Sequence, residues 1–211
     1  SIAREIGAAN QPGQGKYPEA LADLAARQIQ NYAQRYLDFA QPLRRGGDFF
    51  IDKTPGNFHH IGLIKTLFPN AKIIDARRNP MASGWSLYKH FFADSFLFSY
   101  DLDTIGKYYN DYVELMDHWD TVLPGQILTL HYEDLVDDLP AAVDRLLRYC
   151  SLPFEQACLD FHENKRAVAT PISEQVRSPL YTSALDHWKN YEEFLGPLRQ
   201  VISEADAARE R

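Results

Sequence analysis

The chain has 211 residues, of which 45% are hydrophobic and 24% charged, and it is long enough for one sizeable α/β domain. Its formal net charge of −7 argues against a general nucleic-acid-binding surface, although an acidic protein still accommodates a local basic pocket for an anionic ligand. No apolar run approaches the length of a membrane span, and the two cysteines lack zinc-ligand spacing. We therefore expect a cytoplasmic protein without a bound metal.

The first elements predicted along the chain are a loop and a helix. Residues 1–16 contain a cluster of Gly, Asn and Pro, which is typical of a loop. Between Pro18 and Pro42 apolar residues recur at helical spacing. This pattern predicts one amphipathic helix that packs on one face.

A strand–helix–strand unit is predicted next. The apolar segment 48–52 (DFFID) indicates a short strand, 58–68 a helix, and 72–76 (KIIDA) a second strand. A unit of about 30 residues with this order implies parallel strands. Ligands of such sheets bind outside the carboxyl ends of the strands, where Lys53 follows the first strand and Arg78 the second.

The residues after the second strand suit a phosphate group. Asn79 is a good N-cap and Pro80 is favoured at the first helical position, so a helix is predicted from there. Ser86 lies about two helical turns beyond Asn79 and therefore on the same face as the cap. An open helix N-terminus, a hydroxyl and an arginine together favour phosphate binding. We expect Arg78, rather than Arg77, to supply that arginine.

A third strand is predicted at 126–131 (QILTLH), after a long helix at 102–123. Tyr132 leaves its carboxyl end and is expected to join Lys53 and Arg78 at one edge of the sheet. The rest of the chain is predicted to form a helix from Pro140, a further helix through Phe161, a long loop over the site at 164–182, a helix at 184–195 and a last helix from Pro197.

Five segments resemble motifs of the sulfotransferases that use 3′-phosphoadenosine 5′-phosphosulfate (PAPS), and they occur along the chain in the same order as in that family. The closest resemblance is to their bacterial branch, which is often associated with TPR repeats and is related to tyrosylprotein sulfotransferases. The segments are 52–58 (DKTPGNF), 67–71 (LFPNA), the Arg78-Asn-Pro turn with Ser86, 132–135 (YEDL) and 173–181 (SEQVRSPLY). The resemblance covers most of residues 17–198. It implies an α/β, P-loop-NTPase-like parallel sheet flanked by helices, in a single domain over residues 1–211.

The resemblance also implies roles in catalysis for two residues. Lys53 matches the lysine that offsets charge on the leaving phosphate during sulfuryl transfer. His60 stands where the family commonly has a histidine and is a candidate general base, with a structural histidine as the alternative.

Five residues are implied to bind the donor. Arg78 and Ser86 match the family's grip on the 3′-phosphate. Tyr132 is a candidate for stacking on, or hydrogen bonding to, the nucleotide, with a core tyrosine as the alternative. Ser173 lies where a serine of a late loop reaches the donor phosphates, and His187 stands where relatives often carry Lys or Arg.

One family element has no counterpart in the sequence. Residues 1–16 do not resemble the strand and Gly-rich loop that hold the 5′-phosphosulfate, nor the acidic candidate base that follows them. We therefore expect an N-terminally incomplete domain that lacks this first strand and loop, with an upstream TPR domain as a candidate partner in the longer protein.

The function expected from the resemblance is transfer of a sulfuryl group from PAPS to a hydroxyl acceptor. The alternatives are a non-catalytic nucleotide- or partner-binding module of the same fold, and another P-loop-like transferase such as a nucleotide kinase. No nucleic-acid or membrane partner is expected.

Overall fold

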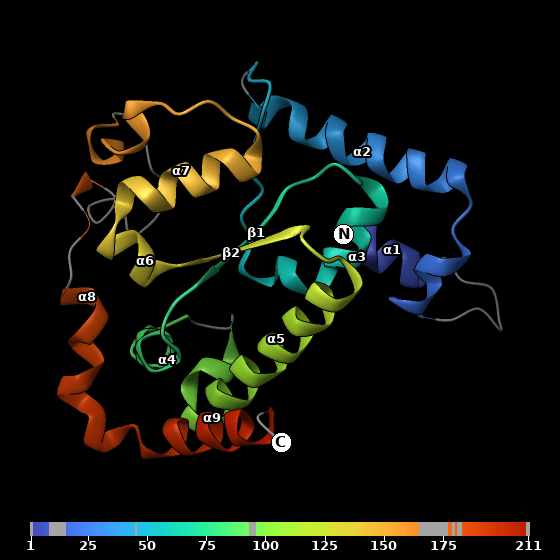
Figure 1. Cartoon of the computed structure of the whole chain (residues 1–211). Helices are drawn as coiled ribbons and strands as arrows, with labels where there is room; N and C mark the ends of the chain where they lie inside the picture. The colour runs from blue at the N-terminus through green and yellow to red at the C-terminus, as the bar shows by residue number, and fades with distance from the viewer. Residues whose placement is uncertain are drawn as a thin grey trace. The chain divides into compact units, whose positions relative to one another are not determined.

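The computed structural model describes residues 2–8, 16–44, 46–92, 96–164, 177–178, 180 and 183–209. They form two compact units, Ser1–Ala71 and Lys72–Arg211, drawn in Figure 1 from blue to red along the chain. Each unit is described separately below.

The unit Ser1–Ala71 is helical. Its elements are α1 (Ile2–Ala8), the 3-10 helix η1 (Glu19–Asp23), α2 (Ala26–Arg44), the 3-10 helix η2 (Pro55–His60) and α3 (Ile61–Leu67). Its core is built by side chains from α1, η1 and α3, namely Ile6, Ala20, Leu63 and Leu67.

Two predictions for the start of the chain are wrong. Residues 2–8 form α1 rather than a loop, because Ile6 is only 1% exposed in the core and Glu5 pairs with Arg35 of α2 at 2.8 Å. The single helix predicted from Pro18 is broken, since Leu24 adopts an extended conformation between η1 and α2.

The predicted strand at 48–52 is also wrong: this segment runs as irregular chain between α2 and η2. Phe49 is 73% exposed and Ile51 91% exposed, so its apolar side chains are not buried against another layer. Arg44 instead donates hydrogen bonds to the carbonyl oxygens of Gly47 and Asp48, at 3.1 and 2.9 Å. An apolar segment becomes a stable strand only when a neighbouring strand completes its hydrogen bonds.

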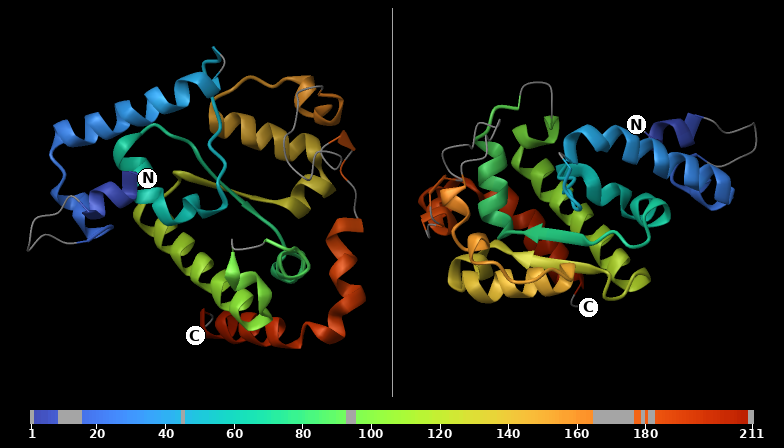
Figure 2. Two further views of the ribbon diagram at one scale, coloured as in Figure 1. Left: turned by 180° about the vertical axis from the view of Figure 1, so that it is seen from behind. Right: turned by 90° about the horizontal axis from the view of Figure 1, so that it is seen from above.

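The unit Lys72–Arg211 contains the parallel sheet. Figure 2 shows its two strands side by side, pointing the same way. They are β1 (Ile73–Arg77) and β2 (Ile127–His131), with Arg77 level with His131. The helices of this unit are α4 (Pro80–Tyr88), α5 (Leu102–Val122), α6 (Tyr132–Asp137), α7 (Leu139–Cys150), α8 (Ser183–Asp186) and α9 (Gly196–Arg209), with 3-10 turns at Leu97–Tyr100, Gln156–Cys158, Phe161–Glu163 and His187–Phe194 (η7).

These bounds confirm most predictions for this unit. Both strands, the long helix between them and the helices that begin near Pro80, Pro140 and Pro197 are present. The helix expected through Phe161 is wrong, since only short 3-10 turns form there. Residues 165–176 of the expected loop lie outside the described residues.

A buried cluster holds α4 in place in this unit. Met81 of α4, Ile105 of α5, and Leu195, Leu198 and Ile202 at or within α9 form the cluster. A Cβ at Gly84 would lie 2.5 Å from a Leu198 methyl group, so α9 approaches α4 closely here and any larger residue would force the Leu198 side chain to move. This close packing fixes the helix that carries Ser86.

Candidate functional site

The turn between β1 and α4 begins the candidate site, and Asn79 shapes it. The Asn79 side-chain oxygen accepts hydrogen bonds from the backbone N–H groups of Met81 and Ala82, at 3.0 and 3.1 Å. Pro80 occupies the first helical position. The predicted N-cap is confirmed, but the predicted open helix N-terminus is wrong, because the cap occupies the N–H groups that an anion would use. An anion at this turn therefore depends on side-chain donors.

Removing this cap should have a measurable effect on stability. We expect Asn79→Ala to lower the free energy of unfolding by about 1 kcal/mol, because two N–H groups lose their acceptor. Asn79→Ser, which keeps a capping oxygen, should recover most of that loss. Urea unfolding followed by tryptophan fluorescence measures both variants, since Trp85, Trp119 and Trp188 all lie in the unit Lys72–Arg211. Equal midpoints for Asn79→Ala and the unsubstituted protein would contradict this role.

Arg77 is engaged inside the unit. Its Nε lies 2.6 Å from a carboxylate oxygen of Asp75, and the hydroxyl of Tyr112 on α5 donates to the other oxygen at 2.5 Å. The guanidinium also lies over the Tyr112 ring, 5.4 Å from its centroid. Asp75 and Arg77 alternate with Ala76 along β1 and so share one face of the strand.

The protonation states of Tyr112 and Arg77 suit this arrangement. Burial raises the pKa of the Tyr112 phenol well above its usual value, and its hydrogen bond to Asp75 adds to the rise. Burial alone would lower the pKa of Arg77, but its contacts with Asp75 and Tyr112 raise the pKa overall. Tyr112 therefore remains a donor, and Arg77 remains charged, near neutral pH.

Arg78 and Tyr132 come together, as predicted. They follow the level ends of β1 and β2, and the Arg78 guanidinium lies over the Tyr132 ring, 5.4 Å from its centroid. A cation at this distance from an aromatic face is attracted to it. The described geometry thus gives Tyr132 a contact with the predicted phosphate-binding arginine.

Ser86 and His187 both belong to the surroundings of α4. Ser86 is half-buried on this helix, two turns beyond Asn79. The neighbouring Trp85 donates its indole N–H to Nδ1 of His187 at 3.3 Å, and the Trp85 ring stacks on Tyr191 with centroids 4.1 Å apart. His187 therefore lies against the helix that carries Ser86, whereas Ser173 lies outside the described residues.

Lys53 lies in the other unit, on a turn held by Asp52. The Asp52 carboxylate accepts a hydrogen bond from the Tyr36 hydroxyl at 2.6 Å and one from the Asn57 amide at 3.2 Å. Lys53 itself is exposed, and it forms no hydrogen bond or ion pair with any residue that the structure describes. The turn is therefore fixed while the ammonium group remains accessible to an anion.

His60 has a partner within the same unit. Its Nδ1 lies 2.6 Å from the Tyr17 hydroxyl, and the two rings are tilted with centroids 5.5 Å apart. Tyr17 also packs against the core formed by α1, η1 and α3. The contact orients His60, and its role as a general base stays a prediction.

Glu133 is a residue that sequence reasoning missed. It follows Tyr132 at the start of α6, and its carboxylate accepts a hydrogen bond from the Asn79 backbone N–H at 2.8 Å. The sequence signal was an acidic residue two positions after the end of a strand, within the YEDL segment. That signal does not reveal the partner, which lies 54 positions earlier.

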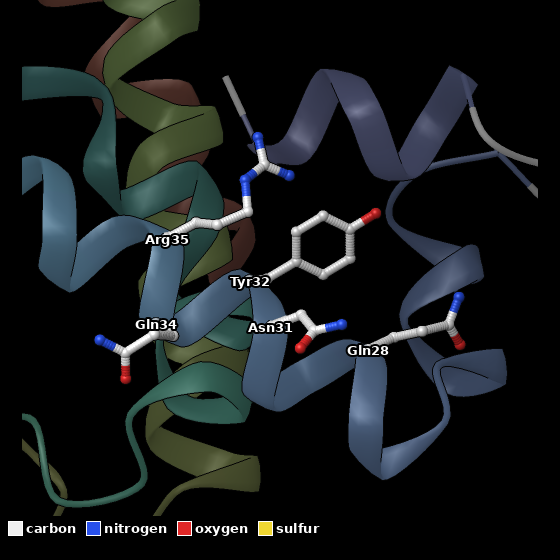
Figure 3. Close-up of a pocket in the computed structure, with 5 residues that line it drawn as sticks. All are labelled: Gln28, Asn31, Tyr32, Gln34 and Arg35. Atoms are coloured by element: carbon white, nitrogen blue, oxygen red, sulfur yellow. The ribbon is translucent and has the colours of Figure 1, made fainter.

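A surface pocket on α2 is not lined by any of the predicted site residues. Figure 3 shows its lining, which consists of Gln28, Asn31, Tyr32, Gln34 and Arg35, all from α2. The charged side chain among them, Arg35, forms two hydrogen bonds with Glu5. This pocket therefore carries no obvious chemistry of its own.

Two kinds of feature are absent from the residues that the structure describes. They contain no group of three or more His, Cys, Asp or Glu side chains that could hold a metal ion. None of their helices combines the length and the apolar character needed to span a membrane.

Comparison with known proteins gives the family. The sequence model of the sulfotransferase family matches residues 4–156. An uncharacterized protein of Aquifex aeolicus (strain VF5) is 36% identical over 192 residues, which are 90% of this chain and 25% of that protein. The chain thus spans about a quarter of the length of this relative. Since the family match extends over more than half of the chain, the protein belongs to the sulfotransferase family.

Proposed function

We propose that the chain is part of a sulfotransferase that transfers a sulfuryl group from PAPS to a hydroxyl acceptor. The observation that carries this proposal is the pairing of Arg78 with Tyr132 at the level ends of two parallel strands. Ser86 follows on the helix that begins at the same turn. The proposal includes the P-loop-like architecture that this family resemblance implies.

The 3′-phosphate of the donor is the group best suited to this turn. Because Asn79 caps α4, the donors for the phosphate are the Arg78 guanidinium and the Ser86 hydroxyl. Arginine forms strong, charge-assisted hydrogen bonds with phosphate oxygens. His187, held against Trp85, is the described side chain proposed to add a further contact to the nucleotide.

The chemistry proposed is a direct displacement at sulfur. The bond between sulfur and the oxygen bridging it to the 5′-phosphate breaks, and its electron pair leaves with 3′-phosphoadenosine 5′-phosphate (PAP). The acceptor oxygen forms a new bond to sulfur, and its proton passes to a base, for which His60 is the candidate. By analogy with phosphoryl transfer, the transition state is loose, so positioning and charge stabilisation supply most of the rate.

Arg78→Ala tests the donor site. In the full-length protein we expect it to weaken PAP binding by about tenfold to about a hundredfold, since a charge-assisted hydrogen bond is worth roughly 1.5–3 kcal/mol. The rise in melting temperature caused by PAP should shrink accordingly, because stabilisation by a ligand depends on its affinity. Differential scanning fluorimetry with a PAP titration measures this.

Arg148→Ala is the matched control, because Arg148 belongs to the same unit and pairs with Asp144 on the exposed side of α7. It should respond to PAP like the unsubstituted protein. No response of the full-length protein to PAP would reject the proposal. A response to PAP without transfer of labelled sulfate from PAPS to any acceptor would indicate a non-catalytic binding module instead.

A further inference from the structure

We infer that Glu133 is a positioning residue for the 3′-phosphate site, acting through the backbone of the turn that carries Arg78. This inference rests on the proposed function and adds a residue to that site. It comes from the hydrogen bond that Glu133 accepts from the Asn79 N–H at 2.8 Å.

The bond completes the N-terminal cap of α4 from outside the helix. In a capping box, the N-cap side chain accepts from the first turn while a Glu three residues later accepts from the N-cap N–H. Asn79 performs the first part here, but the residue three positions later is Ala82. Glu133 of α6 supplies the missing acceptor.

The position of Glu133 gives this bond a consequence for the site. Glu133 is adjacent to Tyr132, whose ring lies beneath the Arg78 guanidinium, and its bonding partner Asn79 is adjacent to Arg78. Two neighbouring contacts therefore join the same two turns, one through side chains and one through the backbone. With the backbone bond removed, one of these two contacts is lost, and the turn holds Arg78 less firmly over Tyr132.

The negative charge of Glu133 and its hydrogen bond have opposite expected effects on phosphate binding, so suitable variants can separate the two. A carboxylate close to a phosphate site repels the ligand, so its charge alone weakens anion binding. Its hydrogen bond, in contrast, favours binding by holding Arg78. Glu133→Gln removes the charge and keeps an acceptor, whereas Glu133→Ala removes both.

The test compares dissociation constants of PAP and of adenosine 5′-phosphate, which lacks the 3′-phosphate, by isothermal titration calorimetry on the full-length protein. We expect Glu133→Ala to weaken PAP binding about tenfold, as for loss of one good hydrogen bond. Binding of adenosine 5′-phosphate should change less than about twofold.

Two control variants complete the test. Glu133→Gln should bind PAP at least as tightly as the unsubstituted protein. Asp134→Ala, which removes the next carboxylate along α6, whose partner is Arg145, should leave both ligands unaffected.

Three outcomes would overturn the inference. Equal losses for both ligands in Glu133→Ala would indicate a general structural role. Tighter PAP binding by both Glu133 variants would show that only the charge matters, and unchanged binding would show no role at all. If the unsubstituted protein fails to bind PAP, the proposed function fails instead, so the two failures are distinguishable.

Discussion

Replacing Lys53 by alanine is expected to lower kcat for the proposed sulfuryl transfer by the full-length protein about a hundredfold or more, with PAP affinity changed less than about threefold. In the proposed reaction, negative charge builds on the 5′-phosphate as its bond to sulfur breaks, so a cation beside the bridging oxygen would stabilise the transition state more than the bound donor. An effect confined to the transition state lowers kcat while leaving binding largely unchanged.

The structure makes this variant interpretable. Asp52, Tyr36 and Asn57 hold the turn, and the exposed Lys53 side chain contributes no hydrogen bond to it within the described chain. The fold should therefore tolerate alanine at this position. Lys53→Arg, which keeps the charge, should retain more activity than Lys53→Ala, and Lys16→Ala, an exposed lysine of the same unit, should retain full activity. A kcat for Lys53→Ala within about threefold of the original would remove Lys53 from the mechanism.

Asp75→Ala is expected to destabilise the unit Lys72–Arg211 by about 3–5 kcal/mol, the usual cost of removing one partner from a buried ion pair. Asp75 is only 9% exposed, and both of its carboxylate oxygens are bonded, one to Arg77 and the other to Tyr112. Without it, a partly buried guanidinium loses its counter-charge and a phenol loses its acceptor. Urea unfolding followed by tryptophan fluorescence should show a much lower midpoint.

A double-mutant cycle separates this network from a simple loss of packing. Tyr112→Phe removes one hydrogen bond from Asp75 and should cost about 1 kcal/mol by itself. In the Asp75→Ala background the same change should cost much less, because the acceptor has already gone. Additive losses would show that the two residues act independently.

The features that sequence predicted well are local in the chain. Asn79 and Pro80 specify the start of α4 through their own side chains, and the apolar runs of β1 and β2 specify the strands. The adjacency of Arg78 and Tyr132 then follows from parallel pairing, which brings residues after two strand ends to one edge.

The features that sequence missed depend on partners far away in the chain. The segment 48–52 has the composition of a strand, but that composition does not show whether another strand lies beside it. Asp75, the ion-pair partner of Arg77, also accepts a hydrogen bond from Tyr112 of α5. The acceptor for the Asn79 N–H is Glu133 of α6. The closing of the helix N-terminus was predictable in principle, since the residue type that makes a good N-cap also occupies the N–H groups of the first turn.

A structure of the full-length protein with PAP bound is the decisive test of the proposed 3′-phosphate site. We expect the 3′-phosphate to lie within hydrogen-bonding distance of the Arg78 guanidinium and the Ser86 hydroxyl, beside the Asn79-capped start of α4. A bound nucleotide whose 3′-phosphate contacts neither side chain would contradict it.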